Sequence, residues 1–576
     1  MIGILLIAYV HGSFGGEIFY PRHSWAQSDR LALAMQFFDK GMDFFHPRTY
    51  YAGSIDQITG VEFPLQSYLA AALGHLFGRE SIPTIFRLIT AAAMLLGCVM
   101  LFRALDERIR NVALSLVVPV WILSSPTVQH YTWSYLPDAC GGGLFFVAIY
   151  YAFRMLREPT AKTALYCVAI ACFAALIKMS VAFYLPVLCI WLFFMLKTPK
   201  ARIQLIMLSA LGASLLLGWL WYMKHLNVTY KSTLFLADMR PLGSTHIESN
   251  PWYDAAWNEL NDIFKERKTE YLSRIGYITV YLSIIVVFVG AFFRNIRTNR
   301  NLSLLFVVLA GSVLGTALMG SQMIAHDYYA IVLWLPTLAM LFIAAMETLY
   351  YALNPLSKGK LVTMAVGAIL SVAIFWPTQR IHLEQTRGQE RQGIAWLMDS
   401  EDFPADLFDK NSRVLFPSED APNLGPTYFG LIGYSRKIEL NGTSGILRLL
   451  GEANAYKLSH VVMPNRQADA LGETVGACQS QWLDTVHRGN TFTVIGFKDI
   501  NKLMPVWMSV RRDSFEWHLP EDSCLELPWT SRVEGFLCEE ISPQRKYGFN
   551  LDLSCQYFQK TERKLSISCL LKHSSP

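Results

Sequence analysis

Charged residues are scarce in this sequence. Only 16% of its 576 residues are Asp, Glu, Lys or Arg, whereas 53% are hydrophobic and the mean hydropathy is +0.29. A soluble protein carries roughly 25% charged residues. The net charge of +5 is small and the basic residues form no single patch, which argues against nucleic acid as a partner. The composition therefore indicates an integral membrane protein that contacts membrane lipid.

Motifs for zinc binding and for cleavable secretion signals are also missing. No CxxC pair or Cys/His spacing typical of a zinc site occurs. The segment 1–10 is apolar but has neither a basic flank nor a small-residue cleavage site. We expect it to form part of a first transmembrane helix.

Half of the ten cysteines lie near the C-terminus, at Cys478, Cys524, Cys538, Cys555 and Cys569. Cys555 and Cys569 flank the stretch QKTERK symmetrically, as the two strands of a hairpin would. In an oxidising compartment the last four cysteines could form two disulfides. The sequence leaves all three pairings of these four open.

Long apolar segments dominate residues 1–377. A helix needs about 20 apolar residues to cross a bilayer, and this criterion predicts about eleven transmembrane helices. We expect them at 2–19, 84–104, 112–127, 139–155, 163–177, 179–196, 203–223, 274–293, 302–323, 329–350 and 361–377.

Basic residues mark every second loop between these segments. Examples from the five short basic loops are Arg108, Arg157, Lys200, Arg297 and Lys360. By the positive-inside rule these loops face the cytoplasm. The loops 20–83 and 224–273, and everything after Pro377, then lie on the outer side. We expect a multi-pass protein of the bacterial inner membrane with its C-terminal part in the periplasm.

The C-terminal part has a different pattern. Short β-rich runs alternate with helical ones over 378–500, which predicts an exported α/β domain, and 501–576 reads as an exported β-rich segment that contains the cysteines. The expected fold class is an α-helical polytopic membrane protein, residues 1–377, with this C-terminal exported α/β and β-rich domain.

Polar side chains gather at the outer ends of the predicted helices, beginning with PRHSWAQSDR at Pro21–Arg30. Ionisable groups at this depth are unfavourable unless they have a function. The main members are His23, Trp25, Gln27, Asp29, Arg30, Arg48, Glu62, Asp138, Lys178, His326, Tyr328 and Tyr329.

These residue types suggest several roles. Asp29, Glu62 and His326 would suit a divalent metal ion, which is therefore a candidate cofactor. The basic side chains that could hold a phosphate are Arg22, Arg30, Arg48 and Lys178. The aromatic residues that suit an interfacial belt or stacking against a sugar are Trp25, Tyr50, Tyr51 and Trp133. The stretch DRLALAMQFFD predicts a surface helix with Asp29 near its start, where the helix dipole favours a carboxylate.

The ordered motifs HSWAQSD, GMDFFHPR, VEFPLQSYLAAALGHLFG, SYLPD and HDYYAIVLWLP carry a resemblance. Together they resemble the GT-C glycosyltransferases, in particular the bacterial family 39 proteins related to protein mannosyltransferases and to the aminoarabinose transferase of lipid A. The resemblance covers about residues 15–350. The sequence departs from the pattern at Ala26, where an Arg is frequent, and at Phe63, where the aminoarabinose transferases have a Lys.

The resemblance implies a membrane enzyme that moves a sugar from a polyprenyl-phosphate carrier to a lipid, glycan or protein acceptor. Asp29 would be the general base on the acceptor hydroxyl. Arg48, Lys178 and His326 would meet the charge of the leaving phosphate. The alternatives are a lipid-linked glycan transporter or flippase, a polysaccharide polymerase or ligase, and a non-catalytic assembly protein.

Overall fold

A computed structural model describes most of the helical part of the chain and portions of the C-terminal part. The described residues are 23–235, 239–244, 252–266, 274–293, 300–354, 359–388, 403–409, 411–417, 423–435, 449, 453, 456–475, 483–498, 508–511, 514–518, 551–561 and 564–573. The chain forms two compact units. The first comprises Met1–Arg48 and Ile58–Glu390, and the second comprises Thr49–Gln57 and Arg391–Pro576.

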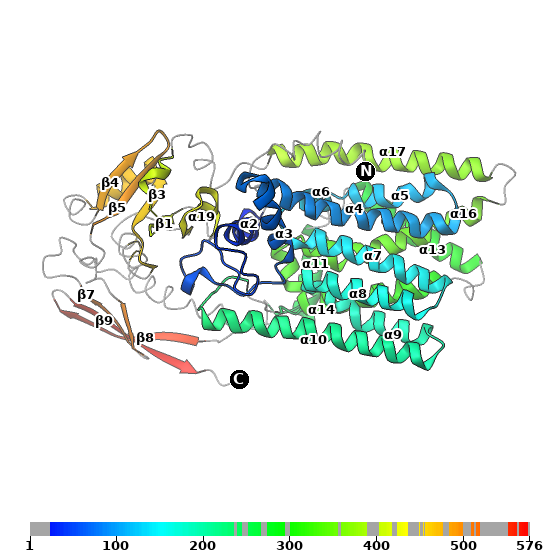
Figure 1. Cartoon of the computed structure of the whole chain (residues 1–576), viewed down its shortest axis with the longest axis horizontal. Helices are drawn as coiled ribbons and strands as arrows, with labels where there is room; N and C mark the ends of the chain where they lie inside the picture. Colours follow the sequence, from blue (N-terminus) through cyan, green and yellow to red (C-terminus); the bar gives the residue numbers. More distant parts are fainter. Residues whose placement is uncertain are drawn as a thin grey trace. The chain divides into compact units, whose positions relative to one another are not determined.

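The first unit is helical (Figure 1). Its α-helices are α2 Ser24–Asp39, α3 Leu65–Phe77, α4 Ile82–Ile109, α5 Val112–Leu123, α6 Pro126–Thr132, α7 Pro137–Arg157, α8 Ala161–Ile177, α9 Leu185–Met195, α10 Pro199–Thr229, α11 Trp252–Glu266, α13 Arg274–Phe293, α14 Arg300–Ala325, α15 Tyr329–Leu333, α16 Leu335–Leu353 and α17 Gly359–Gly388. Two 3-10 helices, η2 Arg79–Ser81 and η3 Met179–Tyr184, precede α4 and α9.

Five of the described helices are long and apolar enough to cross a membrane: Arg79–Ile109, Pro137–Arg157, Pro199–Thr229, Leu302–Met323 and Leu335–Leu353. The pair α5–α6 would add a sixth, broken span bent by 75°. Pro126 begins α6 and cannot continue the preceding helix, which accounts for the break. Shorter apolar helices occupy Ala161–Ile177, Met179–Met195, Tyr277–Gly290 and Gly359–Ile374.

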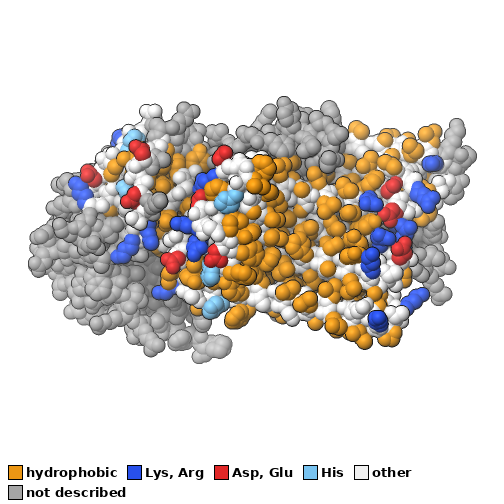
Figure 2. Space-filling view, viewed as in Figure 1, with side chains coloured by type: hydrophobic (Ala, Val, Ile, Leu, Met, Phe, Trp, Pro, Cys, Tyr) orange, Lys and Arg blue, Asp and Glu red, His pale blue; other side chains and the backbone are white. Residues whose placement is uncertain are grey.

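These helices coincide with every predicted span except 2–19, which lies outside the described residues. The predicted multi-pass helical architecture is confirmed, with five to six of the described helices long and apolar enough to cross a membrane. The remaining predicted spans coincide with the shorter apolar stretches, of which Tyr277–Gly290 lies within α13 and Gly359–Ile374 within α17. The total of about eleven spans stays a prediction. Figure 2 shows a broad band of hydrophobic side chains across the long helices, with charged side chains concentrated at both ends of the band.

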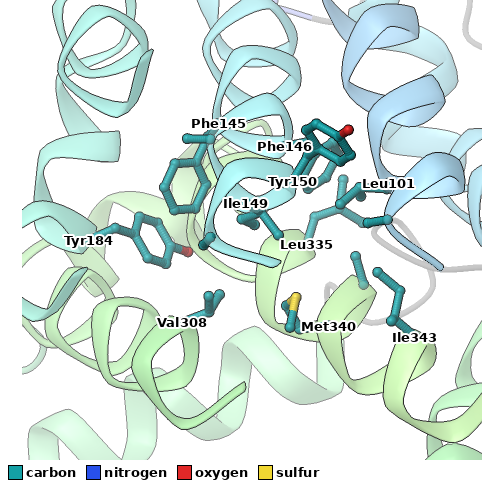
Figure 3. Close-up of a cluster of buried hydrophobic side chains, with 14 of the residues drawn as sticks. Leu101, Phe145, Phe146, Ile149, Tyr150, Tyr184, Val308, Leu335, Met340 and Ile343 are labelled. Atoms are coloured by element: carbon teal, nitrogen blue, oxygen red, sulfur yellow. The ribbon is translucent and has the colours of Figure 1, made fainter. Parts of the chain in front are cut away.

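Small residues let the central helices approach closely. A Cβ added to Gly97 of α4 would lie 2.3 Å from the carbonyl oxygen of Gly143 in α7. One added to Gly143 would lie 2.4 Å from the carbonyl oxygen of Ala93. Such contacts are typical of helices packed within a membrane, where small side chains allow backbone contact. Around them lies an apolar core that α4, α7, η3, α14 and α16 share (Figure 3).

The second unit contains two sheets. The first has the order β2-β1-β3-β5-β4, with parallel pairs around β1 and antiparallel pairs around β5. Its elements are η5 Ala405–Leu407, β1 Arg413–Phe416, α19 Leu424–Phe429, β2 Ile432–Ser435, β3 His460–Pro464, α21 Asn465–Val475, β4 Leu483–Arg488 and β5 Phe492–Phe497. This small mixed sheet agrees with the α/β pattern of the sequence.

The second sheet is antiparallel, with the order β6-β7-β9-β8. Its strands are β6 Met508–Arg511, β7 Ser514–His518, β8 Leu551–Thr561 and β9 Lys564–His573. Cys555 lies opposite Cys569 in the β8–β9 register, as the expected hairpin requires. Cys478, Cys524 and Cys538 lie outside the described residues. The disulfide pairing stays a prediction.

A short piece of the first loop also belongs to the second unit. Residues 49–57 include the 3-10 helix η1 Ile55–Gln57. Ala52 donates its backbone N–H to the carbonyl oxygen of Gly433 at 2.8 Å, and Gly433 donates to the carbonyl oxygen of Tyr50 at 2.9 Å. These bonds extend the edge of the sheet at β2, and the loop tip thus acts as an additional short strand.

Candidate functional site

Helix α2 carries most of the predicted site residues and is buried along most of its length. It follows His23, whose backbone is left-handed with φ of 52°. We expected a surface helix with Asp29 at its dipole-favoured start, and this expectation is wrong. The helix begins at Ser24, so Asp29 lies in its second turn and is only 4% exposed. The dipole acts mainly within the first turn, and another interaction must keep Asp29 in place.

An ionic network of four predicted residues forms where α2, α7 and α8 meet the loop before α3. Arg30 Nη2 donates to Glu62 Oε2 at 2.5 Å. The Lys178 ammonium lies 3.5 Å from Glu62 Oε1 and 3.3 Å from Asp138 Oδ1. Lys178 and Asp138 are almost fully buried. The structure therefore brings these four side chains together in one site.

Local sequence explains how the two buried members reach each other. Pro137 begins α7 and places Asp138 in its first turn. Lys178 caps α8, and its backbone N–H donates to the Ala174 carbonyl oxygen at 2.9 Å. A Cβ added to Gly141 would lie 2.7 Å from Lys178 Cβ. Gly141 therefore leaves the space that the lysine side chain occupies beside α7.

The network carries no net charge, because two cations face two carboxylates. Burial opposes ionisation of Glu62, yet the nearby Lys178 and Arg30 outweigh it and lower the pKa of this carboxyl. Buried charges persist only when they are paired in this way. Lys178 and Arg30 are thus already engaged by carboxylates, and a phosphate that enters the site needs a further cation or must compete for these two.

A second set of contacts centres on Asp327, which is fully buried. His23 Nε2 lies 3.0 Å from Asp327 Oδ1, and the Tyr131 hydroxyl donates to the same oxygen at 2.6 Å. The carboxylate thereby joins the start of α2 to α6 and to the turn before α15. Tyr131 was not predicted, and Asp327 was noted only as part of the motif HDYYAIVLWLP, without a role of its own.

Aromatic rings connect the two sets. The Tyr328 ring centroid lies 5.3 Å from that of His23 and 5.6 Å from that of Tyr131. The Lys178 ammonium lies 5.6 Å from the Tyr328 ring centroid and 4.7 Å from the Tyr329 ring centroid. Rings at these distances attract an ammonium group. Tyr328 and Tyr329 thus cover the lysine and make the two polar sets one site.

His326 belongs to the same site as an uncharged residue. Its ring stacks on Tyr328 at 5.4 Å and lies 5.5 Å from the Trp25 ring. Burial, aided by the neighbouring cations and His23, lowers the pKa of His326 to about 4. At neutral pH it is a neutral imidazole, contrary to the expectation of a cation that meets phosphate. It can still donate one hydrogen bond.

Asp29 shares a face of α2 with Trp25, because the two residues are four positions apart on one helix. Trp25 packs against His326, so Asp29 lies one turn along α2 from the aromatic part of the site. Gln27 is fully buried. The role of Asp29 as a base stays a prediction at this point.

Several predicted residues are not part of these contacts. The backbone of Arg48 pairs with that of Ile58 in an antiparallel bridge, and Arg48 takes no part in the network described above. Tyr51 packs in the second unit, with its ring 6.3 Å from that of Tyr434. Trp133 is 7% exposed and therefore does not form an interfacial belt. Arg22 lies outside the described residues.

The predicted metal ligands do not fit a metal ion. Both carboxylate oxygens of Glu62 face cations, Arg30 on one side and Lys178 on the other. His326 is enclosed by aromatic rings. Within the ranges that the structure describes, no three His, Cys, Asp or Glu side chains come together as metal ligands would. Glu62 and His326 are therefore not suited to act together as metal ligands.

One cation of the site was not predicted. Arg240 is exposed and lies within electrostatic range of His326. Among the described residues it has no ion-pair partner. Its signal in the sequence is weak, namely a basic residue before the turn-forming Pro-Leu-Gly in the long outer loop 224–273.

An apolar cavity of about 530 Å³ begins beside the polar site. Ala330 and Ile331 line it and directly follow Tyr328 and Tyr329 in the chain. The other lining residues come from α6, α11, α13, α14 and α16, from the segment 239–244, and from Ser125 and Trp334, which directly precede α6 and α16. A ligand with an anionic head and an apolar tail would find complementary surroundings at this junction.

Comparisons with known proteins give a match in structure alone. No known protein family and no curated protein matches the sequence. ArnT from Cupriavidus metallidurans, solved with undecaprenyl phosphate, aligns over 86% of this chain and 97% of its own at 12% identity, with a TM-score of 0.41. The oligosaccharyltransferase AglB from Archaeoglobus fulgidus, solved with an inhibitory peptide and a dolichol-phosphate, aligns over 86% and 74% at 10% identity and a TM-score of 0.47.

The arabinofuranosyltransferase AftD from Mycobacteria aligns over 90% of this chain at 12% identity, with a TM-score of 0.52. The chain spans 40% of the length of AftD. At this identity the match concerns the fold, and the chain accordingly has a fold of the GT-C glycosyltransferase type.

Proposed function

We propose that this protein is a membrane glycosyltransferase that moves a sugar from a polyprenyl-phosphate carrier to an envelope lipid, glycan or protein. The observation that carries the proposal is the junction of a buried polar site with an apolar cavity of about 530 Å³. A lipid-linked sugar has the matching chemistry, because its prenyl tail is apolar while its phosphate and sugar are polar. The shared GT-C-type fold supports the proposal.

The proposed base is Asp29. It takes the proton of the acceptor hydroxyl, and the acceptor oxygen forms the new bond to the anomeric carbon of the sugar. The bond from that carbon to the phosphate oxygen breaks, and its electron pair leaves with polyprenyl phosphate. Asp29 then returns the proton to solvent. The 4% exposure of Asp29 supports this role, because a partly desolvated carboxylate is a stronger base than one in water.

The leaving phosphate gains negative charge, so a cation must face it. Arg240 is the best candidate, because it is exposed and has no ion-pair partner among the described residues. Lys178 and Arg30 instead hold Glu62 and Asp138 in place. These carboxylates are suited to accept hydrogen bonds from sugar hydroxyls. His326 contributes a neutral hydrogen-bond donor within electrostatic range of Arg240.

The proposal also covers the membrane in which the protein lies and the side of that membrane on which its parts lie. We infer about eleven transmembrane helices in residues 1–377 of a bacterial inner membrane, on the basic-loop pattern of the sequence. The parts 378–500 and 501–576 then face the periplasm as an α/β domain and a β-rich segment. The charged side chains at both ends of the hydrophobic band are consistent with a membrane-spanning orientation (Figure 2).

The test compares Asp29→Asn with wild type in a native host that lacks its own copy of the gene. Envelope lipids, glycans and glycoproteins are compared by mass spectrometry at equal membrane levels of protein. Asp39→Asn is the matched control, because Asp39 lies on the same helix but forms a surface pair with Arg79. We expect wild type and Asp39→Asn to restore a product larger by one sugar residue, and Asp29→Asn to reduce it about a hundredfold or more.

Other outcomes discriminate the alternatives. Restoration of the same product by Asp29→Asn would remove Asp29 as the base. A change in lipid-linked sugar distribution without any new glycoside would indicate a transporter or flippase. A change in glycan chain length, rather than the addition of a single sugar, would indicate a polymerase or ligase.

A further inference from the structure

Helix α11, which lies within the long loop 224–273, carries a buried carboxylate that the proposed reaction does not use. Glu259 of α11 is fully buried. Its Oε2 atom accepts the backbone N–H of Gly243 at 2.7 Å and the hydroxyl of Ser321 at 2.5 Å. A buried carboxylate is unfavourable unless its oxygens are bonded, and hydrogen bonds to a charged group are stronger than neutral ones. This arrangement is therefore a specific and strong connection.

The connection fixes a short segment, residues 239–244, against α14. Leu242 donates its backbone N–H to the carbonyl oxygen of Ala317 at 3.0 Å. The Ser321 hydroxyl oxygen also lies 2.6 Å from the carbonyl oxygen of Pro241, which competes with Glu259 for its single proton. A Cβ added to Gly320 would lie 2.3 Å from the Leu242 side chain, which shows how tightly the segment lies on the helix. Gly243 has φ of 86°, a conformation that glycine adopts without strain.

The same segment joins both halves of the proposed site. Arg240 lies at its start, within electrostatic range of His326. Leu242, two residues further on, lines the apolar cavity, and so does Leu260, the neighbour of Glu259. A displacement of this segment would therefore move Arg240 and one wall of the cavity together.

We propose that Glu259 is a positioning residue that holds residues 239–244 so that Arg240 meets the phosphate of the lipid-linked donor. This inference rests on the proposed function. Glu259 acts through the backbone of Gly243 and the hydroxyl of Ser321, both of which its carboxylate accepts. These two hydrogen bonds hold residues 239–244 in one position. The exposed side chain of Arg240 would not fix the segment by itself.

The test is a double-mutant cycle on the purified full-length protein in proteoliposomes, with the donor identified by the envelope analysis above. Glu259→Leu removes the acceptor at similar volume and is expected to raise the donor KM about tenfold or more, with little change in the acceptor KM. Arg240→Ala is expected to do the same. If Glu259 acts mainly through Arg240, the two effects are far from additive, and Glu259→Leu has a clearly smaller effect in the Arg240→Ala protein than in wild type.

Two variants control for folding. Glu259→Gln keeps an acceptor oxygen and is expected to retain most of the donor affinity. Asp262→Leu removes an exposed carboxylate on the same helix and is expected to behave as wild type. Full additivity of Glu259→Leu and Arg240→Ala would overturn the proposal, as would equal changes in both KM values.

Hydrogen exchange separates this proposal from the proposed function. The amides of Leu242 and Gly243 are expected to exchange faster in Glu259→Leu than in wild type, whatever the reaction. Faster exchange in Glu259→Leu, together with a wild-type protein that transfers no sugar, would disprove the proposed glycosyltransferase function. It would still support the hydrogen bonds of Glu259 to residues 239–244. Unchanged exchange would disprove the connection itself.

Discussion

The Nε2 atom of His23 lies 3.0 Å from Oδ1 of Asp327, a residue near the other end of the helical unit's sequence. The contact joins the start of α2 to the turn before α15 on one side of the polar site. Tyr131 donates to the same carboxylate oxygen, so one buried side chain holds three parts of the chain together.

Replacement of Asp327 by Ala is expected to destabilise the protein more than replacement by Asn. Ala leaves the buried Tyr131 hydroxyl and the His23 ring without their acceptor, and a loss of this kind amounts to about 1–3 kcal/mol. Asn retains an oxygen for Tyr131. Thermal unfolding in detergent measures the order, with the exposed Asp43→Ala as a control that leaves the midpoint unchanged. Equal midpoints for both Asp327 variants would contradict the assigned contacts.

Gly141→Ala is expected to reduce activity although alanine favours helices. Ala ordinarily stabilises a helix interior relative to Gly by about 1 kcal/mol. At position 141, however, the new methyl group would lie 2.7 Å from Lys178 Cβ and displace the ammonium from Glu62 and Asp138. Gly218→Ala in α10 is the control, because nothing lies within 4 Å of the added group. A Gly141→Ala protein as active as wild type would show that Lys178 tolerates displacement.

The stability of the protein is expected to fall as the pH decreases from about 6.5 to about 4, in part through His326. Burial lowers the pKa of His326 from 6.5 to about 4, so in this window the unfolded chain binds a proton that the folded chain does not. Stability therefore rises with pH there and is complete above about 6.5. His326→Gln should flatten this part of the profile, measured by denaturant unfolding at several pH values. Parallel profiles for the two proteins would exclude His326 as a contributor.

Asn227→Leu is expected to loosen the loop that carries Glu62. The Oδ1 atom of Asn227 accepts the backbone N–H of Gly60 at 2.7 Å, and Gly60 lies two residues before Glu62. The substitution leaves this buried N–H unsatisfied, with an expected loss of about 1–3 kcal/mol in stability and a fall in activity. Faster amide exchange at Gly60 would report the loosening directly. Lys224→Gln, an exposed change on the same helix, should alter neither quantity.

The helices were predictable because the signal is local. Each apolar segment of α4, α7 or α10 contains enough consecutive apolar residues to cross a bilayer, whatever its neighbours are. The bend between α5 and α6 was not predicted, although Pro126 marks it. The described helices support five to six spans, and the predicted total of about eleven stays a prediction, because hydropathy does not show where a helix begins and ends.

Several residues of the polar site could be predicted from the sequence, but the ion pairs between them could not. The motifs indicated Arg30, Glu62, Asp138 and Lys178 as site residues, and the structure joins them. Their mutual neutralisation depends on distances that only the folded chain defines. The same reason explains why the motif HDYYAIVLWLP gave Asp327 no role, since its contacts are with His23 and Tyr131, far away in sequence.

The bonds between the loop tip and Gly433 also impose an order on biogenesis. Residues 49–57 leave the ribosome early, whereas the strand they pair with is made only after all the described membrane helices. A truncated product could insert its helices and still keep this tip without its strand partner. The completed edge at β2 therefore marks synthesis past Ser435, and proteolysis at residues 49–57 during a pulse-chase would report when the chain acquires it.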